Sequence, residues 1–278
     1  MQAEQRRLGQ GQHEGLSANA LKTIAAVTMF IDHGTVTFLE RTISPRTGEI
    51  MALSSDFWYG LDLVGRSIGR QAFPIFAFFI VEGLYHTGSR GKYAFRLFLF
   101  TLISQIPYYL MCFTGPVGST KDVGLNVDAT LTLGFLAIWI LDTVLSPWND
   151  PRKRRHDISL REKIIRGAGC VAVVLGFSLA AYVLNTDYDA IGVIAIVLFY
   201  LFRPYRKMAV LVVWVFLGLC SSSEWLAFPG LLLLLLYNGK KTNQTMAEKK
   251  GWQKYAFYWF YPVHMLILWA LRVLIFRY

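Results

Sequence analysis

The sequence predicts an all-α fold, a polytopic bundle of transmembrane helices, and two observations lead to this prediction. The first is composition: of 278 residues, 54% are hydrophobic and only 17% are charged, with a mean hydropathy of +0.40. Soluble domains carry more charge, roughly 25% of residues. The second is that the apolar residues form separate runs that approach the length of a membrane-spanning helix, divided by short polar segments.

Nine apolar runs predict about nine spans, with a range of eight to ten. They cover residues 20–39, 65–85, 93–113, 129–145, 167–184, 190–202, 208–219, 226–237 and 255–276. Three of them, 190–202, 208–219 and 226–237, are short for helices that need ~20 residues, so the count depends on them. We expect a loop over 40–62 and a kink at Pro74 in the second span.

The positions of Lys and Arg orient the predicted bundle. With a cytoplasmic N-terminus, the inner segments hold most of the 28 Lys and Arg, whereas the outer loops NTDYD (185–189) and SSSEW (221–225) lean acidic. This satisfies the positive-inside rule and predicts a multi-pass protein of the cell (inner) membrane. Because the basic residues sit in short clusters between apolar runs, the net charge of +10 does not indicate a nucleic-acid partner. The expected surroundings are the lipid bilayer.

The chain is expected to form one domain. Residues 1–16 are polar and are predicted to be a disordered tail, and residues 17–278 form a single transmembrane domain without an internal repeat. The three cysteines, Cys112, Cys170 and Cys220, have neither CxxC nor metal-ligand spacing. We expect them to be small hydrophobic residues, with a Cys112–Cys220 disulfide as the alternative, and we predict no metal site.

Ionisable residues inside the predicted spans are the functional candidates, because charge at that depth is costly. The set comprises Lys22, Asp32, His33, Arg70, Glu82, His86, Arg96, Asp142 and His264. We expect Arg70 to pair with Asp32, and Glu82 to pair with Arg96 or Lys22. Asp142 is expected at the membrane interface, and Arg272 is expected to snorkel to the surface. Ion pairs that only fix helix packing are the alternative for Glu82 and Arg96.

His33 is the preferred candidate for a general base, because imidazole titrates near neutral pH and Gly34 beside it leaves room for a ligand. Asp32 points ~100° away on a helix, so it should bind a neighbouring helix instead of His33. His264 follows Pro262 and either lines the same cavity or is structural. His86 is either a site residue or an ordinary surface histidine. The chain has no GxSxG, P-loop or HExxH motif.

Four stretches together resemble a known family. They are LSANALKTIAAVTMFIDHGT, GRQAFPIFAFFIVEGLYHTGSRGKYAFRLFLF, the pair LNVDATLTLG and DYDAIGVIAIVLFYLFR, and YNGKK followed by KYAFYWFYPVHMLIL. Over residues 17–269 the chain resembles the TraX family of membrane proteins, which is associated with acetylation of the F-pilin N-terminus. That family is similar to the multi-span membrane acyltransferases, whose first span often carries a basic residue, ten residues and a histidine. Lys22 and His33 have this spacing, with Lys in place of the commoner Arg, and YPVH resembles a late-span feature of the same group.

The resemblance implies an integral membrane acyltransferase that moves an acyl group, acetyl above all, from cytosolic acyl-CoA to an amine or hydroxyl. A pilin N-terminus, an envelope glycan or another peptide is the expected acceptor. Catalytic roles fall to His33, Asp32 and Arg70, and substrate or CoA binding to Lys22, Glu82, His86, Arg96 and His264.

Two alternatives stay open at this stage. Intramembrane acids and histidines also suit a proton-coupled transporter, although the chain has no inverted repeat. A non-catalytic membrane subunit of a conjugation or secretion assembly is the other alternative. Binding of CoA discriminates both from the acyltransferase.

Overall fold

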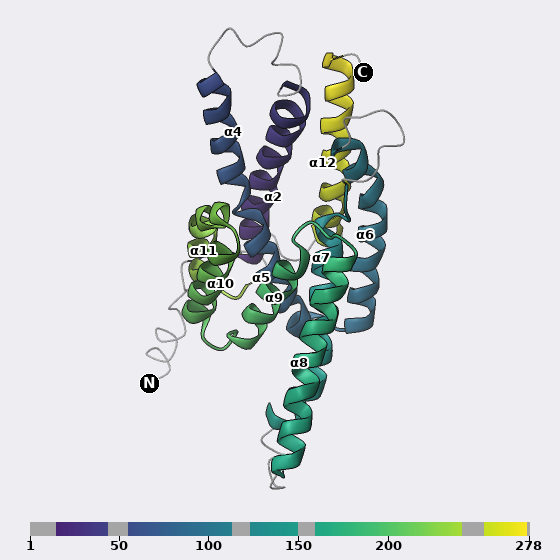
Figure 1. Ribbon diagram of the computed structural model, residues 1–278, viewed down its shortest axis with the longest axis vertical. Helices are drawn as coiled ribbons and strands as arrows, with labels where there is room; N and C mark the ends of the chain where they lie inside the picture. Colours follow the sequence, from purple (N-terminus) through teal and green to yellow (C-terminus); the bar gives the residue numbers. More distant parts are fainter. Residues whose placement is uncertain (1–14, 44–54, 113–122, 150–158, 241–252, 277–278) are drawn as a thin grey trace, which may run out of the picture.

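The computed structural model of the protein describes residues 15–43, 55–112, 123–149, 159–240 and 253–276. Over these residues the secondary structure is helical, apart from turns and two isolated bridges between loop residues, which confirms the predicted all-α class. In chain order the elements are α2 (Ala18–Thr35), η1 (Val36–Ile43), α4 (Ser55–Gly69), α5 (Ala72–His86), α6 (Arg90–Cys112), α7 (Val127–Asn149), α8 (Leu160–Val183), α9 (Asp189–Leu201), α10 (Arg206–Cys220), η3 (Ser222–Ala227), α11 (Phe228–Leu233), η4 (Leu234–Leu236) and α12 (Gln253–Phe276). In the upper half of the molecule, α2 packs against α4 and α12 against α6 (Figure 1).

Five helical segments among the described residues are long and apolar enough to cross a membrane. They are Phe57–His86, Arg90–Cys112, Val127–Leu145, Leu160–Val183 and Tyr255–Phe276. The protein is therefore a multi-pass membrane protein. The count of nine spans stays a prediction, because α2 and the helices between α8 and α12 do not reach the same length and hydropathy. The cytoplasmic N-terminus also stays a prediction.

The second predicted span is a broken helix, α4 followed by α5. The predicted loop over 40–62 is wrong where the structure describes it, because η1 continues to Ile43 and α4 begins at Ser55. The break lies at Arg70–Gln71 and not at Pro74. Its cause is still Pro74, whose ring clashes with a helical carbonyl four residues earlier, at Arg70.

The side chain of Gln71 connects this break to η3 and α11, which lie more than 150 positions later in the sequence. Its amide donates to the carbonyl of Leu226, 2.7 Å away, and its carbonyl oxygen accepts from the backbone N–H of Gly230. The interruption of α4–α5 is therefore held against η3 and α11, and it presents Arg70 to the same neighbours.

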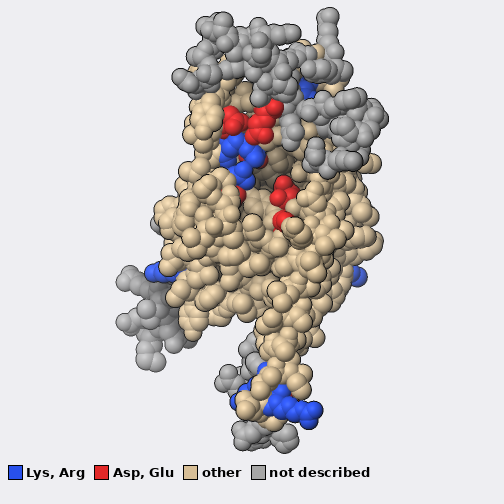
Figure 2. All heavy atoms as spheres, viewed as in Figure 1, with Lys and Arg blue, Asp and Glu red and all other residues tan. Residues whose placement is uncertain are grey.

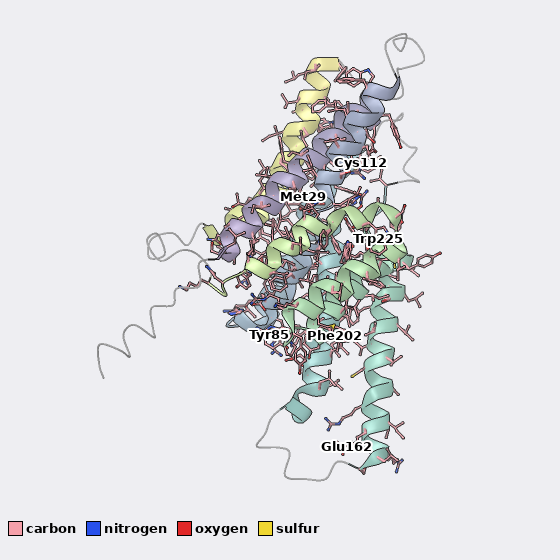
Figure 3. All side chains as sticks on the ribbon, turned by 90° about the vertical axis from the view of Figure 1, so that its left-hand side faces the viewer. Met29, Tyr85, Cys112, Glu162, Phe202 and Trp225 are labelled. Carbon is pink, nitrogen blue, oxygen red and sulfur yellow. The ribbon has the colours of Figure 1, made fainter. Side chains whose placement is uncertain are left out.

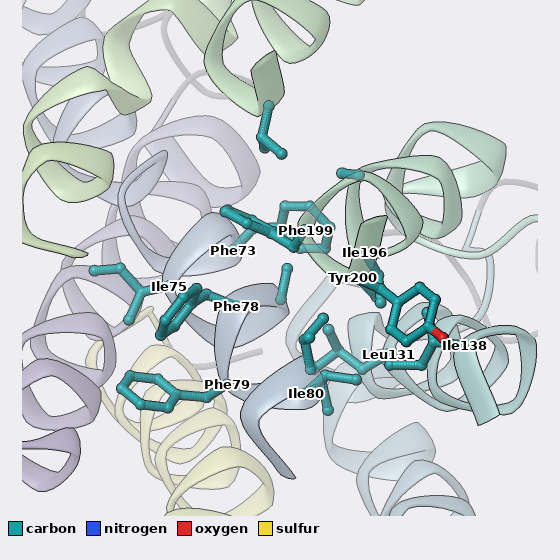
Figure 4. Close-up of a cluster of buried hydrophobic side chains, with 14 of the residues drawn as sticks. Phe73, Ile75, Phe78, Phe79, Ile80, Leu131, Ile138, Ile196, Phe199 and Tyr200 are labelled. Carbon is teal, nitrogen blue, oxygen red and sulfur yellow. The ribbon is translucent and has the colours of Figure 1, made fainter. Parts of the chain in front are cut away.

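Helix α5 forms the centre of the hydrophobic core. Its buried side chains Phe73 and Phe78 face Phe199 of α9, and Ile80 faces Leu131 of α7 (Figure 4). Burying a Phe or Ile side chain contributes roughly 1.5–3 kcal/mol in water, but within a bilayer close packing replaces much of that driving force. The three short predicted spans are all helical, although the third is split into η3, α11 and η4. Their shortness fits helices that are packed into protein on several sides.

Helix α8 is the opposite case, a helix with few neighbours. It packs mainly along α7 and α9, and its lower end, marked by Glu162, extends beyond the other helices of the bundle (Figures 1 and 3). Leu175 and Leu179 are more than 60% exposed. An apolar helix with such a bare surface fits contact with lipid. The basic run RKRRH lies outside the described residues.

Arg272 of α12 closes the end of α6. Its guanidinium donates to the carbonyls of Met111 and Leu110 at 3.0 and 3.1 Å, and the residue is buried. The prediction that Arg272 snorkels to the surface is therefore wrong. The last carbonyls of a helix have no partner within it, and in a membrane they must find another donor.

Replacing Arg272 with Leu should lower the thermal unfolding midpoint of the detergent-purified protein. The substitution leaves the last turn of α6 without its donors, at a cost of about 2–3 kcal/mol. Leu274→Ala is the matched control, because Leu274 lies on the same helix and is 75% exposed. Equal midpoints for the two variants would contradict the capping role.

Candidate functional site

The candidate site is centred on two histidines, His33 near the end of α2 and His264 in the middle of α12. Nδ1 of His33 lies 2.7 Å from Nε2 of His264, and the two rings meet edge to edge and nearly coplanar, with their centroids 4.9 Å apart and 12° between their planes. Nδ1 of His264 lies 2.7 Å from the carbonyl oxygen of Phe260, one turn earlier. His264 is buried and His33 is half-buried. The sequence singled out both residues, and the structure brings them together although 231 positions separate them.

Asp32 binds Arg66 and not the predicted Arg70. Its Oδ1 lies 2.7 Å from a terminal nitrogen of Arg66, whose Nε lies 3.1 Å from Glu40. The prediction fails because α4 ends at Gly69, and Arg66, one turn before the break, is the arginine that lies opposite Asp32. Gly69 makes this approach feasible, because any Cβ there would overlap the Asp32 side chain. As expected from helical geometry, Asp32 is not the hydrogen-bond partner of His33.

Arg70 is paired with Glu224 of η3. The two side chains meet at 3.1 Å, and the hydroxyl of Tyr188 lies 3.5 Å from the same carboxylate oxygen. The Tyr188 ring stacks on Phe73 of α5 with centroids 3.7 Å apart. Glu224 is only 4% exposed, and its Oε2 has no hydrogen-bond partner among the described residues. The second oxygen of this buried carboxylate can therefore accept a hydrogen bond from a donor group of a bound molecule.

The turn between α8 and α9 brings a further carboxylate, Asp187, to the site. The turn is fixed by backbone hydrogen bonds between Leu125 and residues Asn185 and Asp187, each 2.9 Å long. Tyr108 of α6 donates to Asp187 at 3.4 Å. Burial raises the pKa of the Asp187 carboxyl, and the charge of Asp32 adds to the increase, while Arg70 and Arg66 oppose it.

These charged groups gather in one part of the surface. Figure 2 shows Lys, Arg, Asp and Glu side chains within a hollow in the upper half of the molecule, with uncharged surface directly below it. Arg66, Asp32 and Arg70 have side chains 18–27% exposed, so they remain accessible from this side. The arrangement combines a histidine pair, two guanidinium groups and several carboxylates in an otherwise apolar bundle.

Lys22 lies at the opposite end of α2, eleven residues from His33. At 1.5 Å per residue this separates the two by about 16 Å along the helix. Its ammonium nitrogen stands over the ring of Phe79, 4.9 Å from the centroid, and 6.0 Å from that of Phe257. Aromatic faces stabilise a cation in apolar surroundings.

The remaining predicted residues form a separate cluster around the lower end of α5. Glu82 binds Arg203 at 2.9 Å and the exposed His86 at 3.6 Å, so the predicted pairing with Arg96 or Lys22 is wrong. Arg203 was overlooked because it follows α9, far from α5 in sequence.

Two more residues of this region were predicted functional or interfacial. Arg96 lies over the ring of Tyr93, 5.6 Å from its centroid. Asp142 binds Arg90 at 2.7 Å and accepts a hydrogen bond from Tyr200. Neither contacts the histidine pair. Cys112, Cys170 and Cys220 all lie in described helices and none of them forms a disulfide, so the alternative Cys112–Cys220 disulfide is wrong in this structure.

Sequence reasoning overlooked Arg66, Tyr188, Asp187 and Glu224 as site residues. The last three belong to NTDYD and SSSEW, which were interpreted as outer loops and hence as solvated. The available signal was the shortness of the adjacent apolar runs, since short helices carry their connecting turns into the bundle. Among the described residues, no group of three or more His, Cys, Asp or Glu is arranged to hold a metal ion.

Comparison with known proteins gives two matches. A family model described as "TraX protein" matches residues 17–272. The chain is also 28% identical over 274 residues to the probable fimbrial assembly protein FimC, serogroup H1, of Dichelobacter nodosus, covering 91% of this chain and 94% of the relative. No solved structure matches the chain.

Proposed function

The chain belongs to the TraX family, and from this premise we propose that it is an integral membrane acyltransferase. It transfers an acyl group, acetyl above all, from cytosolic acyl-CoA to an amine or hydroxyl acceptor. A pilin N-terminus is the first acceptor to consider, because a relative carries the name of a fimbrial assembly protein. The cell (inner) membrane is the proposed location.

The observation that carries this proposal is the histidine pair inside an apolar bundle. Ionisable groups at such positions are costly and are retained for function. His33, half-buried and hydrogen-bonded to His264, is the proposed general base. Acyl transfer requires such a base to remove the acceptor's proton, together with positive groups near the oxyanion that forms on the acyl carbonyl.

In the proposed reaction, His33 takes the proton of the acceptor N–H or O–H as that atom bonds to the thioester carbonyl carbon. The C–S bond breaks, and the CoA sulfur leaves as a thiolate that recovers the proton from His33. Arg66 and Arg70 supply positive charge on the side of the hollow, where they orient the acceptor or stabilise the oxyanion.

We assign the donor to the opposite end of α2. Lys22 marks that end. Arg90 and Arg206 are the first residues of α6 and α10, Arg203 follows the last residue of α9, and Arg96 lies less than two turns into α6. The phosphates of CoA carry several negative charges, for which Arg and Lys are the usual partners in proteins. His86 and Glu82 lie at the same end and remain candidates for the donor site.

Mass spectrometry of intact pilin and envelope proteins from wild-type and deletion strains tests the function. We expect at least one product to lack an acyl group, 42 Da for acetyl, in the deletion strain. The same product should be restored by the wild-type gene. The purified protein should also gain thermal stability when acetyl-CoA is added.

The outcomes separate this proposal from its alternatives. Loss of pili without any mass change, and no stabilisation by CoA, would indicate a non-catalytic assembly subunit. Uptake of a solute that does not depend on CoA would indicate a transporter.

A further inference from the structure

His33, His264 and the carbonyl oxygen of Phe260 form a row of two hydrogen bonds, and the acceptor at the end of this row determines which nitrogen donates in each bond. The last acceptor is the carbonyl oxygen of Phe260, 2.7 Å from Nδ1 of His264. A carbonyl has no proton to give, so Nδ1 of His264 must carry one. In a neutral imidazole the other nitrogen, Nε2, is then an acceptor.

The same reasoning extends to His33. Its Nδ1 faces the acceptor Nε2 of His264 at 2.7 Å, so Nδ1 of His33 must carry a proton and donate it. Nε2 of a neutral His33 is then left with its lone pair. His33 is thereby held in the one tautomer in which Nε2 is the basic nitrogen.

We propose that His264 is a positioning residue that fixes this tautomer and ring orientation of His33. Its ring is itself held in place, because it is 3% exposed and stacks on Phe260 with centroids 4.6 Å apart. In this arrangement a second histidine does the work that a carboxylate does in a Ser-His-Asp triad. The catalytic consequence rests on the proposed acyltransferase function, whereas the tautomer itself does not.

The surroundings support a neutral pair. The ionisable groups that face His33 are Tyr261 and His264 on α12. Asp32 precedes it on α2 and binds Arg66 of α4, which also binds Glu40 of η1. Both carboxylates are engaged by Arg66. Among the described residues, no carboxylate hydrogen-bonds to either imidazole, so an imidazolium here would face Arg66 without a counter-ion.

The proton balance of the proposed reaction follows from this tautomer. Nε2 of His33 receives the acceptor's proton, and the resulting imidazolium keeps donating through Nδ1 to His264. The hydrogen bond stabilises the charged ring while the C–S bond breaks. Nε2 then returns the proton to the CoA thiolate, and His264 has neither gained nor lost a proton.

Solid-state nitrogen NMR of the full chain in lipid bilayers, with labelled histidine, tests the inference without any substrate. His33→Ala and His264→Phe assign the signals among the five histidines. In the wild type we expect His33 to show a protonated Nδ1, an unprotonated Nε2 and a cross-peak to Nε2 of His264. An unprotonated Nδ1 of His33 in the wild type would overturn the proposal.

The variants test the positioning role. In His264→Phe we expect His33 to lose its single tautomer, and kcat to fall by about 10²-fold with the KM for acetyl-CoA unchanged. His264→Gln keeps an acceptor for Nδ1, and it should restore the tautomer and much of kcat. A His33 spectrum unchanged in His264→Phe would overturn the proposal.

The two readouts also separate this inference from the proposed function. If the protein transfers no acyl group but His33 keeps the expected tautomer, the function is wrong and the positioning role of His264 stands. If transfer occurs and His264→Phe retains full kcat, the function stands and the positioning role is wrong.

Discussion

His33→Ala should reduce acyl transfer by about 10²–10⁴-fold, the range that a general base contributes. The substitution removes the nitrogen that accepts the acceptor's proton, while Lys22 and the basic residues at the other end of α2 remain. We therefore expect binding of the donor to survive, with the same thermal stabilisation by acetyl-CoA as in the wild type. The measurement is incorporation of a radiolabelled acetyl group from acetyl-CoA into the envelope fraction of a deletion strain.

Val27→Ala is the matched control for this experiment. Val27 lies on the same helix, is 53% exposed and contacts neither histidine through a hydrogen bond. We expect its transfer rate to equal that of the wild type. Full transfer by His33→Ala would refute the assigned base even if the protein is an acyltransferase, whereas loss of CoA binding in His33→Ala would place the donor against His33 itself.

Hydropathy predicted the helices well because each apolar run had to be helical to satisfy its backbone in lipid. All nine predicted runs overlap helical segments, including the fragmented η3–α11–η4. The failure lies in the expected loop over 40–62, since α4 begins at Ser55 with a mixture of polar and apolar residues. Composition alone does not distinguish such an amphipathic helix from a loop, because what decides is the neighbour that its apolar face meets.

The histidines were predictable for a different reason. Rare polar residues in an apolar span stand out singly, and His33 and His264 were both found in this way. Their partners could not be found by the same route, because an ion pair depends on helix rotation and on which helices adjoin. Arg66 and Arg70 are one turn apart on the same broken helix, yet they bind Asp32 and Glu224 respectively. The sequence contains no local signal that distinguishes these pairings.

Breaking the Arg70–Glu224 pair should have the largest effect on stability. Arg70→Met leaves Glu224 as a charge that is 4% exposed and without its guanidinium partner. Removing one member of a buried ion pair costs about 3–5 kcal/mol, because the other charge loses its compensation. Glu224→Leu should be destabilising for the same reason, with less effect because Arg70 is 23% exposed on its side chain. Unfolding in mixed micelles, followed by circular dichroism, measures both.

The double variant Arg70→Met/Glu224→Leu separates the pair from the residues themselves. With both charges removed, no buried charge is left uncompensated, so the double variant should be more stable than Arg70→Met alone. If the losses simply add, the two side chains act independently and the pairing does not stabilise the fold. If stability recovers but acyl transfer does not, the pair is dispensable for the fold, and the charges of the pair are needed for the proposed binding of the acceptor in the hollow.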